Sequence, residues 1–92
     1  MNKQLQKIAD HYGKDAQAVQ CAEELCELSC AILQYRKRKG RKELAKVMEE
    51  MADVENMLPQ MKYLYGIGSD FIEELRQEKV DRQLLRIESE GK

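Results

Sequence analysis

Apolar residues recur every three or four positions along most of this chain, which is the spacing that predicts amphipathic helices. Glycines interrupt the pattern at three places and divide the chain into four segments. The expected elements are a short helix over about 3–11, a second helix over about 15–39, a third over about 42–65, and a fourth that begins after Ser69. The sequence therefore predicts an all-α protein.

The expected helix ends follow from capping chemistry. Asp15 is a suitable N-cap for the second helix, and Gly40 is a suitable stop for it. Ser69 is expected to cap the fourth helix in the same way. Pro59 falls inside the third helix and should kink it, because proline lacks the N–H that the helix needs.

Helices joined by such short connections predict an antiparallel helical bundle, formed as a single domain over residues 1–92. A chain of 92 residues has little interior of its own. Its third helix nevertheless carries many large apolar side chains, namely Met48, Met51, Met57, Leu58 and Met61. We therefore expect oligomerisation to complete the core, in a homodimer or a homotetramer.

Charge and composition narrow the range of partners. Sixteen Lys and Arg against 17 Asp and Glu give a net charge of −1, which argues against a basic nucleic-acid-binding module. No apolar run approaches the ~20 residues that span a bilayer, so no membrane association and a cytoplasmic location are expected. Cys21, Cys26 and Cys30 are expected to be small buried residues in a reducing compartment.

Two pairs of acidic residues depart from ordinary amphipathic patterning. Glu24 and Glu27 in the second helix share a face with apolar neighbours, and Glu50 and Asp53 repeat this arrangement in the third. Acidic side chains on a face that should be buried need compensation for their charge. A hard divalent cation, Mg²⁺ or Mn²⁺, supplies it, since carboxylate oxygens are its preferred ligands. The alternative is that these acids are boundary residues paired with Lys or Arg.

The two acidic pairs, separated by 22 residues, resemble the signature of the MazG-like all-α nucleoside triphosphate pyrophosphohydrolase superfamily. The similarity covers about residues 15–88 and includes the neighbouring residues Glu23, Glu49 and Val54. This resemblance implies a MazG-like helical domain with Mg²⁺-dependent hydrolysis of a nucleoside triphosphate between its α and β phosphates. The products would be a nucleoside monophosphate and pyrophosphate.

The resemblance also implies roles for individual residues. Glu24, Glu27, Glu50 and Asp53 correspond to the metal ligands, and either Glu27 or Glu23 could act as the general base. Two other functions stay open: a non-catalytic helical interaction module with structural acids, and a phosphoribosyl-ATP pyrophosphatase, which has the same fold and chemistry.

Other polar residues are candidates for substrate binding. Asn56 lies one turn beyond the last acid, and Lys79 with Arg82 lies in the fourth helix, where relatives hold phosphates; each could equally be an ordinary surface residue. The basic turn over residues 36–42 could attract a triphosphate electrostatically, although cations also suit a helix C-terminus.

Overall fold

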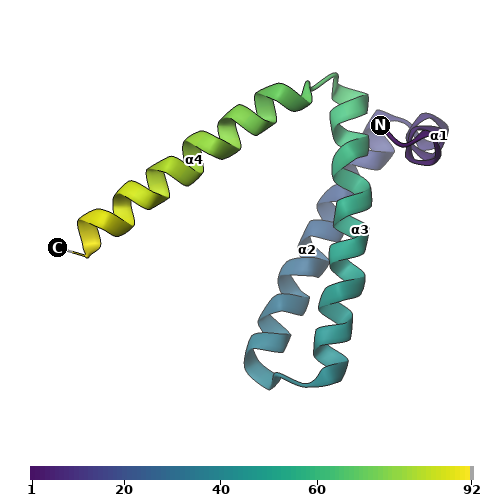
Figure 1. Ribbon diagram of the computed structural model, residues 1–92. Helices are drawn as coiled ribbons and strands as arrows, with labels where there is room; N and C mark the ends of the chain where they lie inside the picture. Colours follow the sequence, from purple (N-terminus) through teal and green to yellow (C-terminus); the bar gives the residue numbers. More distant parts are fainter. Residues whose placement is uncertain (92) are drawn as a thin grey trace.

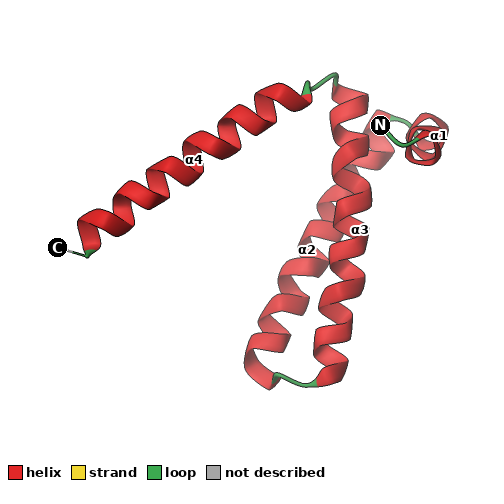
Figure 2. Ribbon diagram, viewed as in Figure 1, coloured by secondary structure: helices red, strands yellow, loops and turns green. Residues whose placement is uncertain are grey.

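The computed structural model describes residues 1–91 and is all-α in that range, with four helices and no strand. Lys92, the last residue of the expected domain, lies outside the described residues. The helices are α1 (Lys3–Tyr12), α2 (Lys14–Arg38), α3 (Arg41–Tyr65) and α4 (Ser69–Glu90). Figures 1 and 2 show α2 and α3 as an antiparallel hairpin, with α1 across one end of it and α4 projecting away.

The hairpin turns through two residues, Lys39 and Gly40. Lys39 adopts the left-handed conformation, with φ of 54°, and its N–H donates to the carbonyl of Tyr35. The sequence pattern assigned the end of this helix to Gly40, but Gly40 instead precedes α3 in an extended conformation. A residue with a Cβ therefore occupies the strained position, while the adjacent glycine does not relieve the strain.

The interior of the hairpin is narrow and contains mostly small or medium-sized side chains. Its buried apolar residues on α2 and α3 are Cys21, Ala31, Val47, Val54 and Met57. Gln17 and Gln60 are buried among them, and Gln17 Nε2 donates a hydrogen bond of 2.8 Å to Gln60 Oε1. This amide pair joins the two helices and satisfies groups that would otherwise be costly to bury.

Helix α1 lies against the open end of the hairpin. Asn2 caps it, because the Asn2 side chain accepts hydrogen bonds from the N–H groups of Gln4 and Leu5. Tyr63 of α3 connects to α1 through its hydroxyl, which donates to Asp10 Oδ1 at 2.7 Å. Ala9 is fully buried in this contact region, so its small side chain lets the helices approach closely.

Helix α4 has no buried residue and does not pack along the other helices (Figure 1). It leaves α3 at Gly66, whose φ of 65° forms the C-cap of α3. Its large apolar side chains are therefore exposed, with Phe71 at 70% and Leu85 at 66%. At about 100° per residue, Phe71 and Leu85 lie on one side of the helix and Val80 and Leu84 on the opposite side. A single chain leaves both sides of α4 without a packing partner.

Several sequence predictions need correction. Asp15 is the second residue of α2 rather than its cap, and Ser69 is the first residue of α4, so Gly13 and Gly68 occupy the N-cap positions without a side-chain hydrogen bond. Cys21 is buried as expected, but Cys26 and Cys30 are exposed.

Helix α3 continues through Pro59 as a single element. Across the described residues 1–91, no helix has an apolar stretch long enough to cross a bilayer.

Candidate metal centre

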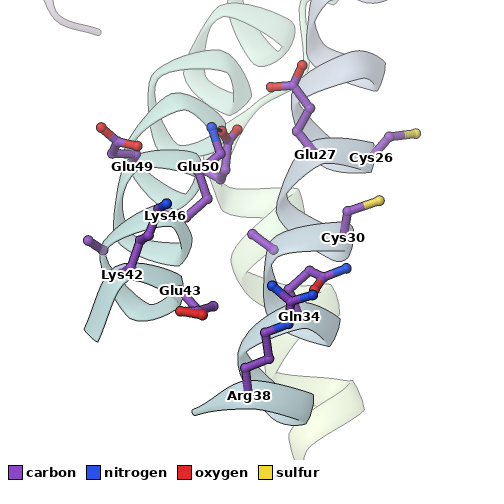
Figure 3. Close-up of a pocket in the computed structure, with 12 residues that line it drawn as sticks. Cys26, Glu27, Cys30, Gln34, Arg38, Lys42, Glu43, Lys46, Glu49 and Glu50 are labelled. Carbon is purple, nitrogen blue, oxygen red and sulfur yellow. Dashed lines mark ion pairs between the residues drawn. The ribbon is translucent and has the colours of Figure 1, made fainter. Parts of the chain in front are cut away.

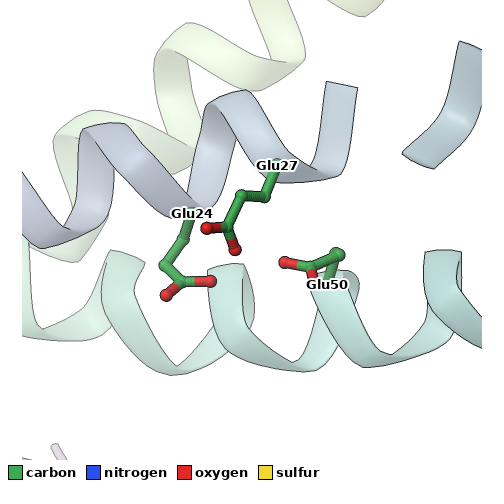
Figure 4. Close-up of side chains that lie close together, drawn as sticks. All are labelled: Glu24, Glu27 and Glu50. Carbon is green, nitrogen blue, oxygen red and sulfur yellow. The ribbon is translucent and has the colours of Figure 1, made fainter. Parts of the chain in front are cut away.

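Three carboxylates from the two hairpin helices meet at one point (Figure 4). Glu24 and Glu27 lie one turn apart on α2, and Glu50 faces them from α3. Each residue offers an oxygen, and these oxygens all lie within 4.8 Å of one another. The antiparallel register of the hairpin thus brings together acids that are more than 20 residues apart in sequence. We call Glu24, Glu27 and Glu50 the carboxylate cluster.

Two carboxylate oxygens in this cluster are buried and have no hydrogen-bond partner. Glu50 is only 3% exposed; its Oε1 lies 2.9 Å from Lys46 Nζ, while its Oε2 has no partner. Glu24 is half-buried; its Oε1 accepts a hydrogen bond of 2.6 Å from Gln20 Nε2, and its Oε2 is also without a partner. Buried polar atoms are normally satisfied. For Glu50 Oε2, a proton shared with the carboxyl of Glu27 or a bound ligand would do this.

The electrostatics of the cluster differ from one carboxyl to the next. The pKa of Glu50 is lowered, mainly because Lys46 donates a hydrogen bond to its carboxylate, and this outweighs the effect of burial. The pKa of Glu27 is raised, first because its carboxyl shares a hydrogen bond with Glu50 and then because the charges of Glu24 and Glu50 oppose its ionisation. Of these two carboxyls, Glu50 therefore ionises at the lower pH, and Glu27 keeps its proton to a higher pH.

A groove of about 990 Å³ runs beside the cluster between α2 and α3 (Figure 3). Glu27 and Glu50 line it together with Arg38 and Lys42, which lie toward the hairpin turn. Lys46 lies between these two groups. The same groove therefore carries carboxylates suited to bind a cation and positively charged side chains suited to bind an anion.

The other predicted site residues lie apart from this cluster. Asp53 is exposed one turn beyond Glu50 and is not part of the group of converging oxygens. Glu23 and Asn56 are exposed, and neither lines the groove. Lys79 and Arg82 lie on α4, which does not pack along the hairpin, so the described chain does not bring them to the carboxylates.

Sequence reasoning missed Lys46, the one cation within residues 1–91 that forms an ion pair with the cluster. Its signal was available, because Lys46 and Glu50 have the i,i+4 spacing at which helical side chains meet. Sequence reasoning also missed the position of Cys26 and Cys30, whose side chains line the groove. Their exposure depends on how α3 crosses α2, which the spacing within α2 does not determine.

The chemistry of the donors fits a hard divalent cation. All three groups in the cluster are carboxylates, and Mg²⁺ and Mn²⁺ prefer oxygen ligands. A cation held there would give the two unpartnered oxygens a partner.

Comparison with known proteins finds no match for the chain among family models, curated proteins or solved structures.

Proposed function

We propose that this protein is a nucleoside triphosphate pyrophosphohydrolase that depends on Mg²⁺ or Mn²⁺ and releases pyrophosphate and a nucleoside monophosphate. The observation that carries the proposal is the pair of buried, unpartnered oxygens on Glu24 and Glu50 beside a groove that also contains cations. The resemblance of the two acidic pairs to the MazG-like superfamily supports the same function.

In this proposal Glu24, Glu27 and Glu50 hold the cation, and Asp53 is the fourth expected ligand. A divalent cation in such a site neutralises phosphate oxygens and lowers the pKa of bound water. Glu27 is better placed than Glu23 to accept a proton from the attacking water, because Glu27 belongs to the cluster and Glu23 does not. The exposure of Glu27 also leaves its carboxyl accessible to solvent and substrate.

Asn56, Lys79 and Arg82 are the substrate-binding residues of the proposal, and Arg38 and Lys42 join them as groove-lining cations. Lys79 and Arg82 can serve this role if α4 of one copy packs against the hairpin of another. The proposal therefore includes a homodimer or a homotetramer, which would also bury the apolar sides of α4. Light scattering that gives a monomer at micromolar concentration would contradict this part.

A screen of the eight common nucleoside and deoxynucleoside triphosphates with Mg²⁺ or Mn²⁺ tests the activity. Release of pyrophosphate from at least one of them, lost in Glu27→Gln and retained in Glu23→Gln, is the expected result. Inactivity of the folded, cation-loaded protein on every triphosphate would overturn the proposal. Inclusion of phosphoribosyl-ATP in the panel separates the nucleotide hydrolase from a phosphoribosyl-ATP pyrophosphatase.

A second candidate function is a helical interaction module, and the exposed apolar sides of α4 favour it. In that case the acids of the hairpin would be structural, and calorimetry would detect neither divalent-cation nor nucleotide binding. The two functions therefore differ in whether the wild-type protein binds Mn²⁺ at all.

A further inference from the structure

The ion pair between Lys46 and Glu50 joins an exposed side chain to a buried one. Lys46 Nζ lies 2.9 Å from Glu50 Oε1, yet the Lys46 side chain is 60% exposed. Two ion pairs form within residues 1–91, and this is the one that reaches the carboxylate cluster. The lysine can therefore leave the pair without unpacking the core, whereas Glu50 is fixed in place.

The charges at this point favour an exchange. Three carboxylates face a single ammonium group, which leaves the cluster negative. A divalent cation at the unpartnered oxygens would lie close to Lys46, and the two positive charges would repel each other. Cation and ammonium thus compete for the carboxylate of Glu50.

The groove offers Lys46 a second position. Its side chain lines the groove between the cluster and the cations Arg38 and Lys42 (Figure 3). A lysine has a flexible stem and three donors at its tip, so it can turn from Glu50 toward a phosphate without backbone movement. A polyphosphate in the groove would lie beside a wall that carries all three cations.

We propose that Lys46 is an exchangeable counter-ion: it neutralises Glu50 in the cation-free protein, is displaced by the divalent cation, and then binds phosphate oxygens in the groove. This inference rests on the proposed function, because it assumes that the cluster binds a cation. It adds a coupling between the two ligands, since cation binding makes Lys46 available to the triphosphate.

The first test measures Mn²⁺ binding to the substrate-free protein by calorimetry. Lys46→Met keeps the apolar stem of the side chain and removes its charge, so Mn²⁺ should bind about fivefold more tightly than to wild type. Lys42→Met is the matched control, because Lys42 lies one turn away on the same groove and has no ion pair with the cluster. Its Mn²⁺ affinity should stay within about twofold of wild type.

The second test measures tripolyphosphate binding to the Mn²⁺-loaded protein. Here Lys46→Met should bind about fivefold more weakly, because a phosphate ligand is missing. Lys37→Met is the control, since Lys37 belongs to the same basic segment but does not line the groove. A purely structural role for Lys46 would weaken both ligands, so opposite changes in the two affinities are specific to the exchange. Lys46→Gln should reproduce both results.

The outcomes separate this inference from the proposed function. Mn²⁺ binding that is equal or weaker in Lys46→Met overturns the exchange, while Mn²⁺ binding by wild type still supports the hydrolase. Unchanged tripolyphosphate affinity in Lys46→Met also overturns it. Failure of wild type and both Lys46 variants to bind Mn²⁺ overturns the exchange and the proposed function together.

Discussion

The α2–α3 hairpin and helix α4 have comparable sequences but very different surroundings. Both contain regularly spaced apolar residues and many charges, and both form long helices. The hairpin buries part of its apolar surface and orders three carboxylates, whereas α4 buries nothing. Helical periodicity therefore predicts that a segment is helical. Whether its side chains form a core or a site depends on the surface against which the helix packs.

The largest expected effect is the loss of activity when the carboxylate cluster is altered. Glu50→Gln should lower pyrophosphate release by at least about 100-fold, because it removes the buried carboxylate that faces both Glu24 and Glu27. Glu49→Gln is the matched control, since Glu49 is the exposed neighbour on the same helix and is not part of the cluster. A steady-state pyrophosphate assay measures both variants, and circular dichroism checks that they remain helical. Equal activity in the two variants would contradict the assignment of the site.

The next largest effect concerns side-chain packing in the α2–α3 hairpin and in α4. Met57→Ala, at a position that is 6% exposed in the hairpin, should lower the free energy of unfolding by about 2–4 kcal/mol. Leu84→Ala, at a position that is 59% exposed on α4, should change it by less than about 0.5 kcal/mol if α4 has no partner. Urea denaturation at several protein concentrations measures both. A large, concentration-dependent loss in Leu84→Ala would show that α4 is buried in an oligomer.

The contrast between these regions also explains what the sequence could and could not predict. The four helices and most of their bounds followed from periodicity and from Gly13, Gly66 and Gly68, because these signals are local. The convergence of Glu24, Glu27 and Glu50 followed from placing two matched faces on either side of a short turn. These features need only the helix period and the length of the connection.

The remaining features depend on how helices cross. Cys26 and Cys30 were expected in the interior because cysteine is a small, readily buried residue, but the crossing of α3 over α2 leaves them on the groove. Helical periodicity also grouped Asp53 with the other acids, although the Asp53 side chain lies outside the carboxylate cluster. The direction in which α4 leaves the hairpin follows from the backbone at Gly66, which a helical pattern does not specify.

A smaller effect concerns the turn that sets the hairpin register. Lys39→Gly should raise the free energy of unfolding by about 1 kcal/mol, because glycine removes the strain of a left-handed residue with a Cβ. Lys37→Gly, inside α2, should lower it by about 1 kcal/mol. Urea denaturation distinguishes the two signs. A destabilised Lys39→Gly would mean that the Lys39 side chain contributes more than its backbone strain costs.

The smallest effect tests the contact that attaches α1 to the hairpin. The hydrogen bond from Tyr63 to Asp10 raises the pKa of the tyrosine hydroxyl above its usual value of 10.0, with desolvation adding to the effect. The folded state thus favours the protonated hydroxyl, so this contribution to stability is complete below about pH 10 and is lost as the pH rises through the raised pKa. Tyr63→Phe should abolish this part of the alkaline loss of stability.

Cys21 and Lys46 also have raised pKa values, the first mainly from burial and the second mainly from its hydrogen bond to Glu50. The contributions of both groups to the stability of the protein therefore also decline as the pH rises. Only the difference between wild type and Tyr63→Phe isolates the contribution of the tyrosine. Urea midpoints measured from about pH 8 to about pH 11 should converge for the two proteins at the alkaline end. Tyr12→Phe, which alters an exposed tyrosine of α1, should follow wild type throughout. A constant gap between wild type and Tyr63→Phe over the whole range would show that α1 is held by packing around Ala9 rather than by the Tyr63 hydroxyl.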